Sequence, residues 1–314
     1  MFRKRIFWAI KLLIALIILV VLVSTIKREA IIEAWLNADK TGVIAALSLL
    51  PVNLLLQAVK WRLLLTTLKP NTSTVEVVGS LLVGFTLGLA TPGRVGEFAR
   101  AFAVRDRNPL QVMGLSLADK FYNLACTALF GGIAILTLPG MILQQNVYII
   151  ISSGLLYLIG AFIIVYLAAH PGFIRGLLYS ISLMLPKRDK LKAIITCLDG
   201  ITPQRARMVF TLSMLFYFTF IVQFFFLANA FSDLTFIDGI RGLPAIIFTK
   251  TFLPISIGGL GVGELAAVRF LSLFRVEAAA AFNASLILFT MNVLAPGIVG
   301  IFFIPRLRFN RGEK

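Results

Sequence analysis

A helix-breaking, charged motif occurs twice in this chain, each time between apolar segments. The first copy is Thr91–Arg100, with the sequence TPGRVGEFAR, and the second is Gly258–Ala266, with the sequence GGLGVGELA. Both run from a bend into Val-Gly-Glu, which aligns Glu97 with Glu264 and indicates an internal repeat. The residues predicted to break the helix, as hinges, are Pro92, Gly93 and Gly96 in the first copy and Gly258, Gly259, Gly261 and Gly263 in the second.

Apolar segments interrupted by Gly or Pro at matching places in two halves of a membrane protein indicate a binding site between structural repeats. A structural role is the alternative. Glycines let membrane helices pack closely, and a Glu among them can simply pair with a nearby Arg.

The composition places the chain in a membrane. Hydrophobic residues make up 59% of it and charged residues only 14%, which excludes an ordinary water-soluble domain. The excess of 30 Lys and Arg over 14 Asp and Glu favours cytoplasmic loops beside anionic lipid rather than binding of nucleic acid. One His and two Cys without C-x-x-C spacing predict neither a metal site nor a disulfide, and no cofactor is expected.

Six apolar segments are long enough to cross a bilayer: 6–26, 42–60, 110–138, 147–169, 208–231 and 278–304. No small-residue cleavage site follows the first, so it is predicted to stay as an uncleaved span. Two further segments, 75–107 and 243–275, contain the motifs, and each apolar arm is only about 16 residues, short of the roughly 20 that a span needs. At the end of the second span, Lys60-Trp61-Arg62 is typical of an interfacial anchor.

The positive-inside rule decides between two topologies. If every apolar segment crossed, the basic connector 171–207 would lie outside, whereas re-entrant hairpins at 75–107 and 243–275 place it and both termini in the cytoplasm. The shift that superposes Glu97 on Glu264 also carries residue 42 to 209 and residue 138 to 305. We therefore predict an all-α polytopic membrane protein with a single transmembrane domain, 1–314, of six spans and two re-entrant hairpins. Its repeats, 42–138 and 208–305, each run span-hairpin-span with inverted topology.

The bends should face a cavity, because non-helical backbone in a membrane needs polar partners. The start of a helix after each bend suits an anion such as a lipid phosphate. Glu97 lies one helical turn from both Arg94 and Arg100 and is expected to restrain one of these guanidinium groups. The predicted headgroup-binding residues are Arg94, Glu97, Arg100, Lys120, Lys250 and Glu264.

Asp119 and Lys120 are adjacent on one helix, so they face different directions and each needs a partner elsewhere. We expect Lys120 or Arg94 to complete a charge network with Glu97, and we assign Asp119 to that network. Structural cohesion and substrate binding are both open as its role. No arrangement of nucleophile and base is found, so no catalytic residue is predicted.

These motifs resemble the transmembrane region of lysylphosphatidylglycerol synthases, the flippase-like part of the multiple peptide resistance factor, and its stand-alone relatives. The resemblance is carried by Trp61-Arg62, Pro92–Glu97 with Arg100, Asp119-Lys120, and Pro254–Gly261 with Glu264. Asp119-Lys120 stands where relatives are expected to have Glu-Arg. The resemblance implies a protein of the bacterial or archaeal inner membrane that moves, or helps to present, a polar-headed lipid.

The expected function is therefore a flippase that moves an anionic or polar-headed phospholipid through a cavity between the two repeats. The soluble aminoacyl-transferase domain of the full synthases is not found, and no P-loop occurs, so transport would be passive or driven by an ion gradient. The alternative is an integral-membrane enzyme, or its accessory subunit, acting on polyprenyl-phosphate or glycolipid precursors. Membrane lipids are the expected partners, and the oligomeric state is not predicted.

Overall fold

The computed structural model describes residues 19–91, 93–138, 147–183, 192, 194–253 and 259–306. Most of the predicted first span, the hinge residues Pro92 and Gly258, part of the basic connector and the tail from residue 307 lie outside these ranges. The α-helices are α2 (Arg28–Leu36), α3 (Lys40–Ser48), α4 (Leu50–Leu65), α5 (Thr74–Leu89), α6 (Pro109–Thr137), α8 (Val147–Ala169), α9 (Pro171–Leu183), α11 (Pro203–Phe231), α12 (Phe236–Phe252), α13 (Val262–Leu271), α14 (Ala278–Phe289) and α15 (Ala295–Gly300). The tighter 3₁₀ helices are η1 (Val95–Ala103), η2 (Cys197–Gly200), η3 (Ser272–Phe274) and η5 (Ile301–Arg306), and η4 (Thr290–Leu294) is a π-helix.

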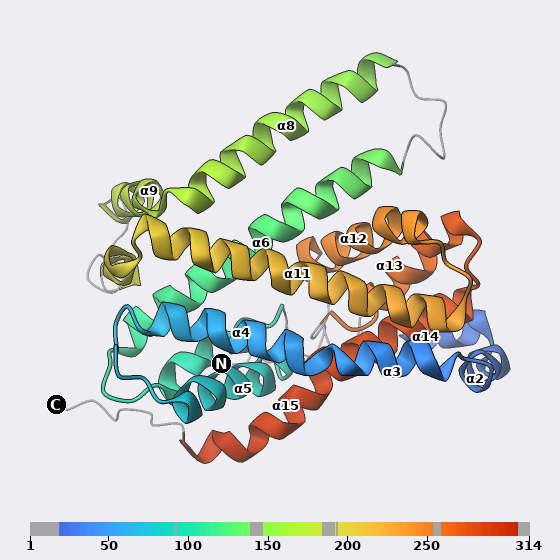
Figure 1. Cartoon of the computed structure of the whole chain (residues 1–314), viewed down its shortest axis with the longest axis horizontal. Coiled ribbons are helices and arrows are strands. Elements are labelled where there is room, and N and C mark those ends of the chain that lie inside the picture. The colour runs from blue at the N-terminus through green and yellow to red at the C-terminus, as the bar shows by residue number, and fades with distance from the viewer. Residues whose placement is uncertain are drawn as a thin grey trace, which may run out of the picture.

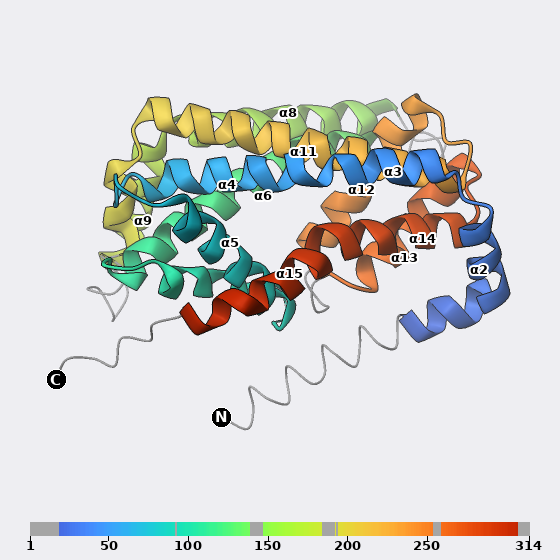
Figure 2. The same cartoon turned by 60° about the horizontal axis from the view of Figure 1, so that its bottom comes forward.

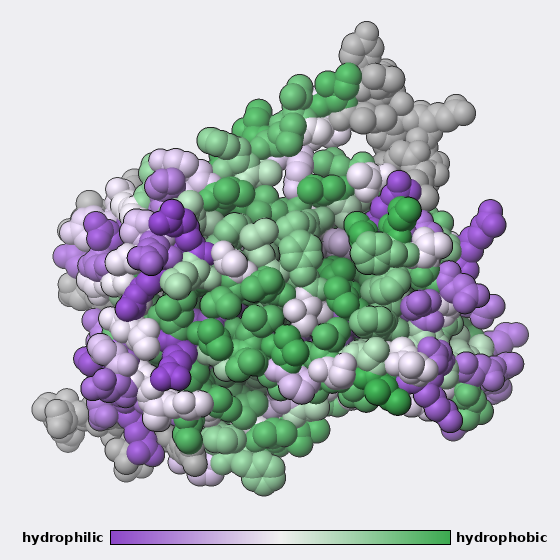
Figure 3. All heavy atoms as spheres, in the orientation of Figure 1, coloured by the Kyte–Doolittle hydropathy of each residue, from purple (hydrophilic) through white to green (hydrophobic). Residues whose placement is uncertain are grey.

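Five helical stretches of the described residues are long and apolar enough to cross a membrane: Lys40–Leu65, Pro109–Thr137, Ile151–Ala169, Pro203–Phe231 and Ala278–Pro305. They coincide with five of the six predicted spans. Hydrophobic side chains cover the middle of the face seen in Figure 3, and hydrophilic ones gather at its two ends. An all-helical, multi-pass membrane protein, as predicted, accounts for both observations.

The first motif turns the chain back on itself. Helix α5 ends at Leu89, Gly93 and Arg94 take left-handed conformations with φ of 61° and 56°, and η1 then packs along α5. Gly96 permits this close return, because a Cβ at that position would lie 1.9 Å from the carbonyl oxygen of Leu87. The segment after the first bend is thus a 3₁₀ helix, tighter than an α-helix.

The second motif makes a similar reversal between α12 and α13, which pack against each other. Gly259 and Gly261 have φ of 80° and 85°, a region that glycine adopts easily. Helix α12 begins at Phe236, where the Thr235 hydroxyl caps it by accepting from the backbone N–H of Asp238. The apolar arm of this pair is therefore longer than the predicted arm, which started at 243.

The first helix pair, α5 with η1, and the second, α12 with α13, occupy opposite ends of the molecule. Helices α3–α4, α11 and α14–α15 run along its length (Figures 1 and 2). The packing is reciprocal, because α6 packs on α12 and α15 packs on α5. One hydrophobic core, with Trp61, Val77 and Leu115, lies around the first pair, and another, with Phe224 and Ile246, lies around the second. Gly93 and Arg94, after the first bend, and Gly259, in the second turn, line one cavity, which is the candidate site.

Candidate functional site

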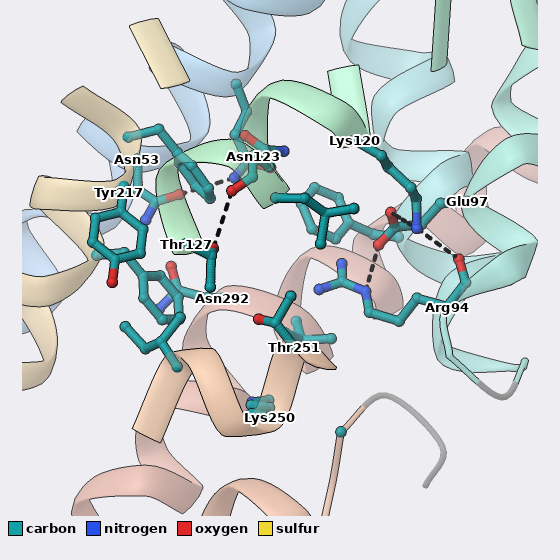
Figure 4. Close-up of a pocket in the computed structure, with 18 of the residues that line it drawn as sticks. Asn53, Arg94, Glu97, Lys120, Asn123, Thr127, Tyr217, Lys250, Thr251 and Asn292 are labelled. Atoms are coloured by element: carbon teal, nitrogen blue, oxygen red, sulfur yellow. Dashed lines mark hydrogen bonds and ion pairs between the residues drawn. The ribbon is translucent and has the colours of Figure 1, made fainter. Parts of the chain in front are cut away.

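A cavity of about 500 Å³ lies between the two turns (Figure 4). Gly93 and Arg94 of the first turn and Gly259 of the second line it, together with residues of α4, α6, α11, α12 and η4. The two copies of the motif, far apart in sequence, therefore meet at one cavity.

Arg94, Glu97 and Lys120 form a half-buried ionic cluster on one side of this cavity. The Lys120 ammonium lies 3.0 Å from Glu97 Oε2 and donates to the backbone oxygen of Arg94 at 3.3 Å. Arg94 Nε forms an ion pair with Glu97 Oε1. The predicted pairing of Glu97 is therefore present with both cations, and the cluster keeps an excess positive charge.

Lys250, near the end of α12, adds a cation to the cavity wall from the second helix pair. No described residue forms an ion pair with it, and its ammonium lies 5.5 Å from the centroid of the Phe289 ring. Its stem lies along the second turn, where a Cβ at Gly259 would come within 2.6 Å of Lys250 Cε and one at Gly263 within 3.1 Å of Cδ. Glycine at these hinge positions therefore makes room for the lysine.

Glu264 lies behind the wall rather than on it. Its side chain is fully buried, and its carboxylate accepts from the backbone N–H of Gly261 at 2.6 Å and from the Ser285 hydroxyl at 3.3 Å. Glu264 thus satisfies the first turn of its own helix α13, where a negative charge is favoured. Although Glu97 and Glu264 align in sequence, one binds cations and the other caps a helix.

Arg100 and Asp119 also line the cavity, but they pair with each other in a more deeply buried network. Arg100 Nη2 lies 2.9 Å from Asp119 Oδ2, and Lys60 Nζ lies 2.9 Å from Asp119 Oδ1. The guanidinium also donates to the Ser116 hydroxyl and stacks over the Trp61 ring, 3.8 Å from its centroid. Arg100 therefore pairs with Asp119 and not with Glu97.

The interpretation of Lys60-Trp61 as an interfacial anchor is wrong for both side chains, which are 1% and 0% exposed. Lys60 is buried because Asp119 neutralises it, and Trp61 because its indole N–H donates to the Ser80 hydroxyl at 2.9 Å. Only Arg62, the next residue, is exposed. The unmatched charge of Asp119 was the signal that could have identified Lys60 as its partner.

Uncharged polar residues that the motifs did not indicate line the other side of the cavity: Asn53, Asn123, Thr127, Ser213, Tyr217 and Asn292. Figure 4 shows Asn53, Tyr217 and Asn292 gathered away from Arg94, Glu97 and Lys120. Asn53, Tyr217 and Asn292 are polar residues within largely apolar helices, which in a membrane protein is itself a signal of an inward-facing position.

Long apolar helices around a charged internal cavity define a polytopic membrane protein with a site for a polar group. The sequence matches the family model described as the lysylphosphatidylglycerol synthase TM region over residues 8–300, so the chain belongs to this family. The resemblance drawn from the motifs is thereby confirmed. Searches of curated proteins and of solved structures found no significant match.

Proposed function

We propose that this chain is a lipid translocase of the cytoplasmic membrane, which moves an anionic or polar-headed phospholipid through the central cavity. The observation that carries the proposal is the charge of the wall, where four cations, Arg94, Arg100, Lys120 and Lys250, outnumber two carboxylates, Glu97 and Asp119. A negatively charged headgroup would be attracted to this excess in a setting of low dielectric. Membership of the family supports a role in lipid modification or translocation.

Arg94 is the proposed first contact for the phosphate. It meets Glu97 through Nε, and no described residue accepts a hydrogen bond from its Nη groups, which stay available for a bidentate contact. Lys250 would hold the same anion from the opposite turn as a point charge. Glu97 would restrain Arg94 and Lys120 when the cavity is empty.

The proposed membrane topology has six spans, two re-entrant hairpins formed by α5–η1 and α12–α13, and both termini in the cytoplasm. The reciprocal packing of α6 on α12 and α15 on α5 supports two inverted repeats, since each would close the hairpin of the other. Rocking of one repeat against the other would open the cavity to one leaflet at a time. Movement would be passive or coupled to an ion gradient.

The carboxylates near the cavity favour binding over catalysis. Glu97 pairs with two cations, Asp119 with Lys60 and Arg100, and Glu264 accepts from a backbone N–H. A general base needs a carboxylate that can take a proton from the substrate. We therefore propose transport rather than acid–base chemistry on a lipid precursor.

The test is transport by purified protein in liposomes. Fluorescent phosphatidylglycerol in the inner leaflet should become accessible to a membrane-impermeant quencher much faster with the protein than in protein-free liposomes. Arg94→Ala and Lys250→Gln should each slow it at least tenfold, while Arg62→Ala, which removes an exposed arginine outside the cavity, serves as the matched control. Wild-type protein that moves no lipid would refute the function, and full activity of both cavity variants would refute the site.

A further inference from the structure

The cavity has two chemically different sides, and the uncharged one is not explained by binding of a phosphate. Asn53 from α4, Ser213 and Tyr217 from α11, and Asn292 from η4 form this side, which we call the neutral wall. All four are at least 95% buried. Ser213 and Tyr217 are one helical turn apart, so both hydroxyl-bearing side chains lie on the same face of α11.

The neutral wall holds polar atoms without partners. Asn53 Nδ2, Ser213 Oγ, Tyr217 Oη and Asn292 Oδ1 make no hydrogen bond to any described residue. Buried polar groups in native proteins are nearly always paired, and those that are not need an explanation such as a ligand. Four such atoms from three segments, gathered at one cavity, point to a ligand that makes several hydrogen bonds.

The hydrogen bonds of the Asn292 amide determine its orientation and therefore which of its two polar atoms has no partner. The backbone oxygen of Ala46 accepts from Gln223 Nε2 at 3.0 Å, so Gln223 Oε1 must be the acceptor for Asn292 Nδ2, also at 3.0 Å. The backbone oxygen of Leu288 accepts from the same Asn292 nitrogen. Since a carbonyl can only accept, this chain leaves Asn292 Oδ1 as an unused acceptor.

With the other three atoms, the neutral wall offers both hydrogen-bond donors and hydrogen-bond acceptors. Asn53 Oδ1 accepts from Gln57 Nε2 at 2.8 Å, which leaves Asn53 Nδ2 as a donor, and the two hydroxyls can both donate and accept. A phosphate offers only acceptors and an ammonium only donors. A hydroxyl group offers both, so several neighbouring hydroxyls would match the whole set.

The size and lining of the cavity agree with a bulky headgroup. Its volume of about 500 Å³ lies within the range of roughly 300–1,000 Å³ found for sites of whole small molecules. Phe216 and Phe220 also line it. Aromatic faces beside uncharged hydrogen-bonding groups suit a polyol, whose C–H faces pack on rings while its hydroxyls bond to amides.

We infer that the neutral wall binds the polyhydroxyl part of a lipid headgroup, a glycosyl or cyclic polyol unit, while Arg94 and Lys250 bind its phosphate. This inference rests on the proposed function and narrows its substrate class. The phosphate alone would give affinity for any anionic lipid, and the neutral wall would select among anionic lipids by their hydroxyls.

The test compares two lipids of equal charge. Dioctanoyl phosphatidylinositol carries a ring of hydroxyls, and dioctanoyl phosphatidylpropanol has none. Wild-type protein in detergent should bind the first at least tenfold more tightly, because each hydrogen bond to a buried polar group adds to the difference. Binding of glucosyl dioctanoylglycerol, a neutral lipid, tests the neutral wall without the phosphate. This lipid should bind more tightly than dioctanoylglycerol, which lacks the sugar.

Tyr217→Phe and Ser213→Ala should each bring the ratio of the two affinities toward one. Both variants should fold, because the removed hydroxyls have no partner in the described structure. Tyr166→Phe, on the exposed surface of α8, is the matched control and should keep the wild-type ratio. Equal binding of the two phospholipids by wild-type protein would overturn the inference. Transport of both lipids in liposomes is measured separately, so that absence of transport would overturn the proposed function without deciding the binding preference.

Discussion

Replacement of Asp119 by Asn would test the buried network that Asp119 forms with Lys60 and Arg100 beside α5 and η1. Asn keeps the shape of the side chain but removes the charge that lies 2.9 Å from both Lys60 Nζ and Arg100 Nη2. The side chains of these cations are only 2% and 5% exposed, so water can replace little of the lost carboxylate interaction. Breaking a buried ion pair by removing one partner costs about 3–5 kcal/mol, and we expect Asp119→Asn to destabilise the protein by that amount.

Lys60→Met provides the informative comparison. It leaves Asp119 paired with Arg100, a neutral pair, and removes one buried charge with its desolvation penalty. We expect a loss of about 1–3 kcal/mol, below that of Asp119→Asn, because Asn123 Oδ1 loses its donor but no uncompensated charge remains. Asp119→Glu keeps the charge and should cost least.

Thermal unfolding in detergent measures the difference through the two cysteines, both buried. A dye that fluoresces on reaction with thiols reports their exposure on unfolding. The midpoint should fall by about 5–15 °C in Asp119→Asn and by a few degrees in Lys60→Met. A wild-type midpoint for Asp119→Asn, or a lower midpoint for Lys60→Met than for Asp119→Asn, would refute the charge argument.

Three further outcomes follow from the geometry. Gly96→Ala should prevent stable folding, because the new Cβ would lie 1.9 Å from the Leu87 oxygen, whereas Gly154→Ala, with nothing within 4 Å, should be neutral in yield and unfolding midpoint. Burial raises the pKa of the Cys197 thiol to about 12, so native protein should react slowly with maleimide at pH 8 and fully only after denaturation; fast native labelling would contradict this burial. A cysteine at the exposed Asn108 position should be labelled only from the cytoplasmic side if α5–η1 is re-entrant, and labelling from outside would favour an eight-span topology.

The length of the apolar segments predicted the spans well, because a bilayer needs long apolar segments and a span is a local property of the sequence. Five spans were predicted in this way, and the two chain reversals were predicted from the Gly-rich motifs together with the positive-inside rule. The ionic cluster of Arg94, Glu97 and Lys120 was also foreseeable, since charges within apolar sequence must find partners. Lys60 was misassigned because a basic residue near the end of a span has the same local pattern at an interface as in a buried ion pair.

The neutral wall could not be derived from local sequence, because its residues come from three helices and none carries a charge that demands a partner. Asn53, Ser213 and Asn292 each lie in a largely apolar segment, and only the packing of α4, α11 and η4 brings them together. The orientation of Asn292 depends on two further contacts, with Gln223 and with the backbone of its own helix. Such a wall is a property of the assembled fold.

The repeated Val-Gly-Glu shows the limit of inference from a repeat. Glu97 follows Arg94 by one turn and can hold a cation, but the corresponding position before Glu264 is Gly261, whose backbone N–H becomes the partner instead. The second cation of the cavity therefore has to come from the other arm of the pair, as Lys250, and the glycines at 259 and 263 leave space for its stem. Both copies of the repeat thus place a turn at the same position. The residue three positions before the glutamate, Arg94 or Gly261, decides whether that glutamate pairs with a cation of the cavity or caps its own helix.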